Sequence, residues 1–153
     1  MDKIVVTALL IVVGIISVVS LFNALYPLIT QSTEAMASME RRADDRLKTQ
    51  VQILHAAPAG SDLYLWVKNV GASRILGVES SDVFFGPQGN YARIGFGAGT
   101  PNWQYVIESG GTDWNPTATI KIIIYGYGAP APGRYFAKIV LPNGISDETF
   151  FSW

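Results

Sequence analysis

The chain has no cysteine and only one histidine, His55. Without cysteine it can form no disulfide, and it offers neither a thiolate metal ligand nor a thiol nucleophile. His55 has no serine or acidic residue at the spacing of a catalytic motif. Asp82, Asp147 and Glu148 leave a cation site open as an alternative, but oxygen ligands recur nowhere at a calcium-loop spacing. We therefore expect a protein that is not an enzyme and has no catalytic residue, no bound metal and no cofactor.

The chain also has no excess of charge of either sign. Its 11 basic and 12 acidic side chains give a formal net charge of −1 at pH 7, with histidine neutral. The charges are evenly divided, since residues 34–55 hold four acids and four bases and residues 56–153 hold seven acids and six bases. Because nucleic-acid binding depends on a basic surface, no nucleic-acid partner is expected.

A third absence lies near the N-terminus, where no charged residue occurs between Lys3 and Glu34. The apolar run from Ile4 to Leu25 has 22 residues, and as a helix it would be about 33 Å long, close to a bilayer core of about 30 Å. A cleaved signal peptide is disfavoured, because the run is too long and no small-residue cleavage site follows it. Two interpretations remain: a single-span anchor, or a helix that lies in the membrane before assembly and forms the core of a filament afterwards.

In the filament interpretation, the core-forming residues are Ile4, Leu9, Val13, Gly14, Ile16, Leu21 and Pro27. Gly14 is small enough for a second helix to approach closely. Pro27 removes one helical hydrogen bond, so a bend is expected there. An alternative is that the helix ends just before Pro27.

The next segment has the pattern of an amphipathic helix. Apolar residues recur three or four positions apart at Met36, Met39, Ala43, Leu47, Val51 and Leu54, which is the spacing of one helical face. We therefore predict a continuous helix from Ile4 to about Val51. Its proximal stripe, defined as Met36, Met39 and Ala43, is expected to face neighbouring subunits.

After His55 the apolar pattern changes to a period of two, punctuated by glycine and proline. Leu63, Leu65 and Val67 alternate with polar or aromatic residues, and Asn143-Gly144 is a strong hairpin signal. Seven or eight short strands of this kind predict an antiparallel β-sandwich. The fold class is therefore α+β, with a helical part at residues 1–55 and a sandwich head at residues 56–153.

Three stretches carry a resemblance to a known family. They are DDRLKTQVQILHA at 44–56, YLWVKNVGASRI at 64–75 and SSDVFFGP at 80–87. Together with the N-terminal helix they resemble the archaellum (archaeal flagellum) proteins of the type IV pilin superfamily, in which a K-N-x-G turn like the one at 68–71 is frequent. The resemblance implies a pilin-like helix followed by an immunoglobulin-like sandwich. Position 5 is Val5, whereas bacterial type IV pilins carry an acidic residue there, so an ordinary bacterial pilus is disfavoured.

The resemblance implies one of two functions. We place first a filament subunit that polymerises through its helix into an archaellum or type IV pilus-like fibre for motility or adhesion. This role implies a helical homopolymer, a prepilin-type peptidase and an assembly platform as partners, and a change of location from the membrane to an extracellular filament. The alternative is a membrane-anchored accessory stator protein of the G or F type that binds the cell envelope or S-layer. Met1 is then either the true start or the residue left after removal of a leader.

Overall fold

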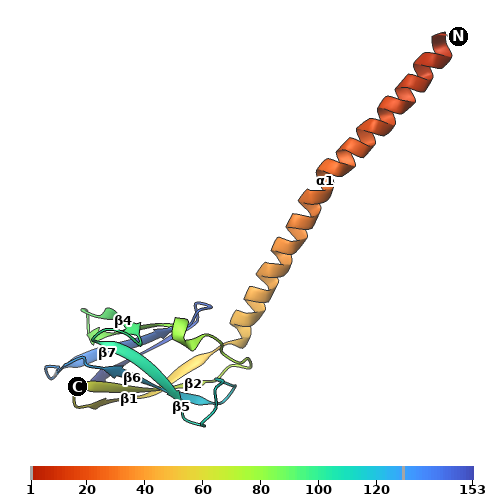
Figure 1. Cartoon of the computed structure of the whole chain (residues 1–153). Helices are drawn as coiled ribbons and strands as arrows, with labels where there is room; N and C mark the ends of the chain where they lie inside the picture. The colour runs from red at the N-terminus through yellow and green to blue at the C-terminus, as the bar shows by residue number, and fades with distance from the viewer. Residues whose placement is uncertain (1, 129) are drawn as a thin grey trace. The chain divides into compact units, whose positions relative to one another are not determined.

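The computed structural model describes residues 2–128 and 130–153, which form one long helix, a short 3₁₀ turn and eight strands (Figure 1). The elements in chain order are α1 (Asp2–Lys48), β1 (Val51–Ala59), β2 (Asp62–Asn69), the 3₁₀ turn (Val78–Ser80), β3 (Asp82–Pro87), β4 (Ala92–Phe96), β5 (Asn102–Ile107), β6 (Thr119–Tyr125), β7 (Arg134–Val140) and β8 (Ser146–Ser152). The chain divides into two compact units, residues 1–42 and 43–153.

Helix α1 confirms the predicted long N-terminal helix. It continues through Pro27 without ending there, so the alternative of a boundary before this proline is wrong. The hydroxyls of Thr7 and Ser17 donate to the carbonyls of Lys3 and Val13, each at 2.8 Å. Because these hydroxyls bond within the helix, they do not oppose burial of the segment in lipid.

Helix α1 ends at Lys48, three residues before the predicted end, and β1 begins at Val51. Two residues of the predicted helical stripe, Val51 and Leu54, therefore lie on a strand, and this part of the prediction is wrong. The reason is packing of this segment against the rest of the β unit. Val51 is only 6% exposed in the core of the β unit, and burial of an apolar side chain outweighs a small difference in helix propensity.

The eight strands are hydrogen-bonded to one another in the order β1-β2-β6-β5-β4-β3-β7-β8. All neighbours are antiparallel except β4 and β5, which pair in parallel through only Gly95–Asn102 and Phe96–Trp103. The first residues of β4 instead pair with β3, so β4 joins the two halves of the sheet, which face each other as layers. The predicted α+β class with a β-sandwich is confirmed, although the parallel β4–β5 pairing was not expected.

Alternation along the strands builds the core between these layers. From one side come Leu63, Leu65, Val67, Trp103, Ile120, Ile122 and Ile124, and from the other Val83, Phe85, Tyr135, Ala137 and Ile139. Strand β2 shows the expected period of two throughout, whereas in β6 the inward isoleucines are fully buried and Ile123 on the other face is also only 9% exposed. This rigid sandwich positions the loops described next.

Candidate functional site at the C-terminal end of the helix

The end of α1 is fixed by backbone hydrogen bonds from the turn that follows β2. The Lys48 carbonyl accepts from the N–H groups of Ala72 at 2.8 Å and Ser73 at 3.1 Å, and the Gln50 carbonyl accepts from Val70 at 2.9 Å and Gly71 at 3.0 Å. The last carbonyls of a helix have no partner within the helix. Here the 70–73 turn supplies partners, so the last helical turn is held by the β unit to which residues 43–48 belong.

The turn is itself organised by Asn69, a polar residue with no exposed surface. Its side-chain amide donates to the carbonyls of Ser73 at 2.9 Å and Trp114 at 3.2 Å, while its side-chain oxygen accepts from the Gly71 N–H at 3.0 Å. A buried amide of this kind is stable only when its hydrogen bonds are made. Asn69 therefore links the 70–73 turn to the loop that carries Trp114.

Gly71 allows the turn to lie directly against the chain at the end of the helix. A Cβ atom at this position would lie 2.5 Å from the Lys48 carbonyl oxygen and 2.6 Å from the Gln50 nitrogen. Both are backbone atoms that cannot rotate away. The K-N-x-G turn noted in the sequence is therefore a packing motif, in which asparagine supplies the hydrogen bonds and glycine the close approach.

A second loop holds the same helical turn from β7 and β8. The Arg46 side chain donates through Nε to the Asn143 carbonyl at 2.9 Å. The loop is a tight hairpin, since Gly144 has a φ of 85° and the Asn143 side-chain oxygen accepts from the Ile145 N–H at 3.1 Å. The hairpin predicted from Asn143-Gly144 thus also contacts the last turn of α1. We call this turn, together with the loops at 70–73 and 142–145, the joint.

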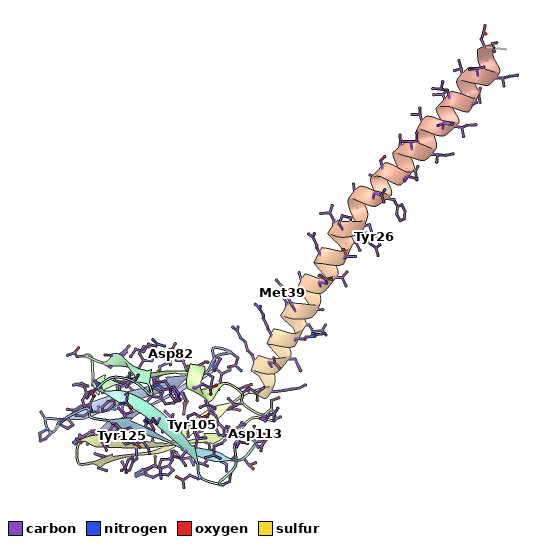
Figure 2. The ribbon with its side chains drawn as sticks, viewed as in Figure 1. Tyr26, Met39, Asp82, Tyr105, Asp113 and Tyr125 are labelled. Carbon is purple, nitrogen blue, oxygen red and sulfur yellow. The ribbon has the colours of Figure 1, made fainter. Side chains whose placement is uncertain are left out.

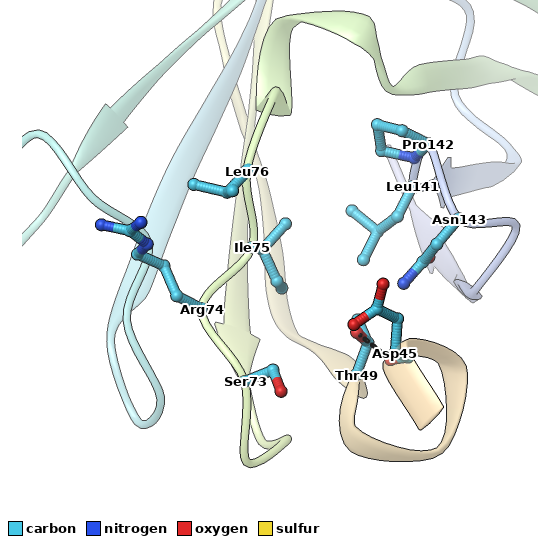
Figure 3. A pocket seen from close by; sticks show the side chains of 9 residues that line it. All are labelled: Asp45, Thr49, Ser73, Arg74, Ile75, Leu76, Leu141, Pro142 and Asn143. Atoms are coloured by element: carbon cyan, nitrogen blue, oxygen red, sulfur yellow. Dashed lines mark hydrogen bonds between the residues drawn. The ribbon is translucent and has the colours of Figure 1, made fainter. Parts of the chain in front are cut away.

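A cavity of about 220 Å³ lies between these loops and the helical turn (Figure 3). Its lining consists of Asp45, Thr49, Ser73, Arg74, Ile75, Leu76, Leu141, Pro142 and Asn143. In Figure 3 the side chains of Ile75 and Leu141 point into the cavity, whereas Arg74 points away from it. We call the cavity with its surrounding loops the joint cavity.

Charged side chains of both signs surround the joint cavity. Arg74 forms an ion pair with Asp113 at 2.9 Å, and Lys48 forms one with Asp44 at 2.7 Å. The hydrogen bond and the charge of Asp44 raise the pKa of Lys48 above its usual value. Among the described residues, no ion pair or side-chain hydrogen bond involves the carboxylate of Asp45. The charge of Asp45 also acts on Lys48 and raises its pKa further, so Lys48 faces two carboxylates at the end of α1.

Solved structures identify the family. The chain is similar to the archaellum periplasmic stator protein FlaG from Sulfolobus acidocaldarius, with 31% identity, a TM-score of 0.62, and coverage of 67% of this chain and 99% of that chain. The chain belongs to the FlaG family of archaellum stator proteins. It is likewise similar to a chain in the FlaF–FlaG stator complex from the same organism, with 31% identity, a TM-score of 0.60, and coverage of 67% of this chain and 89% of that chain. No protein-family model matches the chain, and neither does any curated protein.

This result confirms the resemblance to the archaellum accessory proteins of the G and F types. The association with the archaellum therefore stands, and the similarity favours the stator alternative over the filament subunit that we placed first. The relatives are stator proteins, and they support neither a homopolymer nor a peptidase as partner of this chain.

The residues predicted for a filament core are all on α1. The apolar side chains among them are exposed, for example Val13 at 50% and Ile4 at 77%, and apart from the two neighbouring residues and the helix's own backbone no atom lies within 4 Å of a Cβ built at Gly14. Met36 and Met39 of the proximal stripe are each 70% exposed, and Figure 2 shows Met39 projecting outward from α1. Their role as contacts to neighbouring subunits stays a prediction.

The side chains considered for catalysis or cation binding are not brought together in one site. His55 lies on β1, exposed, with its ring centroid 5.7 Å from that of Trp66. In the part of the chain that the structure describes, no group of three or more histidine, cysteine or acidic residues could hold a metal ion. The acidic residues considered for a cation have other partners, since Asp82 pairs with Arg93 and Glu148 with Lys138.

Sequence reasoning missed the residues that form the joint cavity. Asp45, Leu76 and Leu141 come from three separate segments, and no local pattern relates them. The only available signals were the K-N-x-G turn and the Asn-Gly hairpin, each of which turned out to position one wall. Spacing along a chain cannot show that two turns meet at the end of a helix.

Proposed function

We propose that this chain is a membrane-anchored, non-catalytic stator component of an archaellum. The observation that carries the proposal is the similarity over 99% of the length of an archaellum stator protein at 31% identity. The apolar segment of α1 supports the anchor, because the helix contains a window with a mean hydropathy of 3.0 and none of that window is buried by the rest of the chain. A bilayer would cover this surface.

The joint at the end of α1 supports a mechanical role. A stator must pass load from its anchor to the domain that contacts the envelope, and a flexible linker would absorb that load as hinge motion. Here only Thr49 and Gln50 separate α1 from β1, and the 70–73 turn bonds to both sides of this link. Thr49 is itself buried, and its hydroxyl donates to the Asp45 carbonyl at 2.6 Å. Within residues 43–153, the last turn of α1 and the start of β1 are therefore held by both backbone and side-chain hydrogen bonds.

A FlaF-type protein is the partner we propose for the β unit, since a FlaG of the same family was solved in complex with FlaF. Attachment to the cell envelope or S-layer is the second expected contact, as in the stator interpretation of the sequence. Under this proposal the chain stays in the membrane and works in few copies per archaellum, rather than in the many copies of a fibre.

Shearing cells and comparing the two fractions by quantitative mass spectrometry tests the proposal. We expect the chain to remain with the membranes and the major filament protein to appear in the sheared fibres. Detergent extraction of those membranes should then recover a FlaF-type protein together with the chain. Finding the chain as an abundant component of the sheared fibres would restore the filament-subunit interpretation.

A further inference from the structure

The loops at the end of the sandwich away from the joint contain no charged residue. Strands β1, β3 and β6 end there, and β2, β4, β5 and β7 begin there. The four loops that connect these strands are 60–61, 88–91, 97–101 and 126–133, which we call the distal loops. None of their residues is Asp, Glu, Lys, Arg or His. In contrast, the connections at the joint end, 70–81 and 108–118, carry Arg74, Glu79, Glu108 and Asp113.

The distal loops lie against one another and against the strand ends between them. The Gly126 N–H donates to the side chain of Asp62 at 3.0 Å, directly after the first loop. A Cβ atom at Gly126 would lie 2.8 Å from the Cγ2 methyl of Thr100 in the third loop. The Gln88 N–H donates to the Arg134 carbonyl at 2.9 Å, beside the fourth loop. The four loops therefore form one surface, as loops at the end of a sandwich commonly do.

The strand ends that border the distal loops add no net charge. The charged residues at these positions are Asp62, the first of β2, and Arg134, the first of β7. Asp62 accepts hydrogen bonds from the Gly126 N–H at 3.0 Å and from the Ser61 hydroxyl at 3.3 Å. The guanidinium carbon of Arg134 lies 5.0 Å from the centroid of the Phe150 ring. One acid and one base, each in contact with its own chain, leave this end neutral.

Exposed aromatic rings gather at the same end. In the described part of residues 43–153, the phenylalanine, tyrosine and tryptophan side chains with the largest exposed fractions are Tyr91, Phe96 and Phe150, at 51%, 43% and 43%. Tyr91 lies in a distal loop, and Phe96 directly precedes another. The ring of Phe136 lies 4.6 Å from that of Tyr91 and 5.2 Å from that of Phe150, between centroids. An aromatic row therefore continues from the distal loops across β7 to β8.

A neutral surface with exposed aromatic rings has the composition of the centre of a protein interface. Charged residues are depleted there, and tyrosine and phenylalanine are enriched. A partner that buried an unpaired charge against this surface would lose the solvation of that charge without compensation, so the partner surface has to be uncharged as well. Alanine and proline side chains, such as Ala98, Pro101 and Pro132, offer nothing for sugar hydroxyls to bond. A protein partner is therefore favoured over a glycan.

We propose that the distal loops, together with Tyr91, Phe96 and Phe150, bind the FlaF-type partner through an uncharged surface of that protein. This inference rests on the proposed stator function, in which a FlaF-type protein contacts the β unit, and it names the surface used. Strand β1 begins two residues after the end of α1 and runs to the distal loops. Load taken up by the partner would therefore pass along the strands of the sandwich to the joint.

The test measures binding of the FlaF-type protein from the same organism to the full chain in detergent. Ala98 is exposed in a distal loop, so Ala98→Lys and Ala98→Glu introduce charge of either sign at this surface. Ala72→Lys is the matched control, because Ala72 is an exposed alanine at the joint end. We expect both Ala98 variants to weaken binding by about fivefold or more, and Ala72→Lys by less than about twofold. Binding by the unaltered chain should change by less than about twofold between about 0.1 M and 1 M sodium chloride.

Tyr91→Ser tests the aromatic contribution and should also weaken binding by about fivefold or more. Since the Ala98 side chain is exposed, circular dichroism is expected to show an unchanged fold for its variants, which decide the matter even if Tyr91→Ser is unstable. If one charge at Ala98 weakens binding and the other strengthens it, the partner surface is charged and the inference is overturned. The inference is also overturned if all the variants bind as well as the parent.

Three further outcomes would overturn the inference. Loss of self-association in the Ala98 variants, with FlaF binding unchanged, would identify a second copy as the occupant. Loss of binding after enzymatic removal of the partner's glycans would identify a sugar. If the unaltered chain stays with the membranes but binds no FlaF-type protein, the proposed partner and this surface are both overturned, whereas the membrane location expected of a stator stands.

Discussion

The backbone N–H of Ile53 on β1 donates a hydrogen bond to the side chain of Asp147 on β8, at 2.6 Å. These strands are the two ends of the strand order, so a single side chain joins the open edges of the sandwich. The pairing of β1 with β2 shifts register between Ile53 and His55, which is typical of a bulge that redirects backbone groups. The bulge and Asp147 together close the seam between the edges.

We predict that Asp147→Ala destabilises the β unit by about 1–3 kcal/mol, because the Ile53 N–H loses its acceptor in a partly buried seam. Urea unfolding of a fragment comprising residues 43–153, which form a compact unit with their own core, would measure this change. Glu148→Ala is the neighbouring control. Its carboxylate pairs with Lys138 and is half exposed, so we expect a loss below about 1 kcal/mol. Equal losses in the two variants would show that Asp147 has no special role at the seam.

The strands themselves could be predicted because burial follows their periodicity. Leu63, Leu65 and Val67 alternate in the sequence and are 0–1% exposed in β2. The beginning of β1 could not be predicted in the same way, because Val51 and Leu54 also continue the helical spacing of Met36 to Leu47. Two periodicities overlap there, and the choice between them depends on hydrogen bonds from residues 70–73, which lie some 20 positions further along the chain.

Gly71→Ala should destabilise the β unit strongly, by about 2–4 kcal/mol, since the added methyl would overlap two backbone atoms at the end of α1. Gly111→Ala is a suitable control, because its nearest neighbour would be the Asp113 nitrogen at 3.9 Å. We expect this control to unfold within about 0.5 kcal/mol of the parent. Thermal or urea unfolding of both variants would measure the difference. A Gly71→Ala protein as stable as the parent would mean that the turn does not need its close approach to the helix end.

The joint could not have been deduced from any one of its parts. Asn69 and Asn143 were recognised as turn residues, but that assignment gives only a local conformation. Their functional placement depends on the sandwich, which brings the ends of β2 and β7 to the same helical turn. A long-range arrangement of this kind requires the topology, and the strand order, with its parallel β4–β5 contact, was not predictable from alternation.

The proposed membrane anchor predicts a graded response to buried charge. Residues 4–25 include 15 Val, Ile, Leu and Phe residues, which together favour insertion by roughly 4–9 kcal/mol, against a cost of about 2.5–3.5 kcal/mol for one aspartate. Val13→Asp alone should therefore stay in carbonate-washed membranes. The triple variant Leu9→Asp, Val13→Asp, Ile16→Asp should be released from them. Release of the single variant, or retention of the triple one, would contradict a simple lipid anchor.

The proximal stripe of α1 gives the sharpest remaining test of self-association. Met36, Met39 and Ala43 share one helical face, whereas Arg41 lies at least about 140° around the helix from each of them. Because the chain has no native cysteine, a single introduced thiol can report on contacts between copies without background. If this stripe packs against a second copy, Met39→Cys should form disulfide-linked dimers under mild oxidation in membranes, at least about threefold more than Arg41→Cys on the opposite face. We expect this result, because two methionines that are each 70% exposed leave apolar surface that a neighbouring helix in the same membrane can cover. Equal yields from the two positions would mean that copies meet only by chance collision. The stripe would then face solvent or a different protein, and its predicted role as a contact between copies would be wrong.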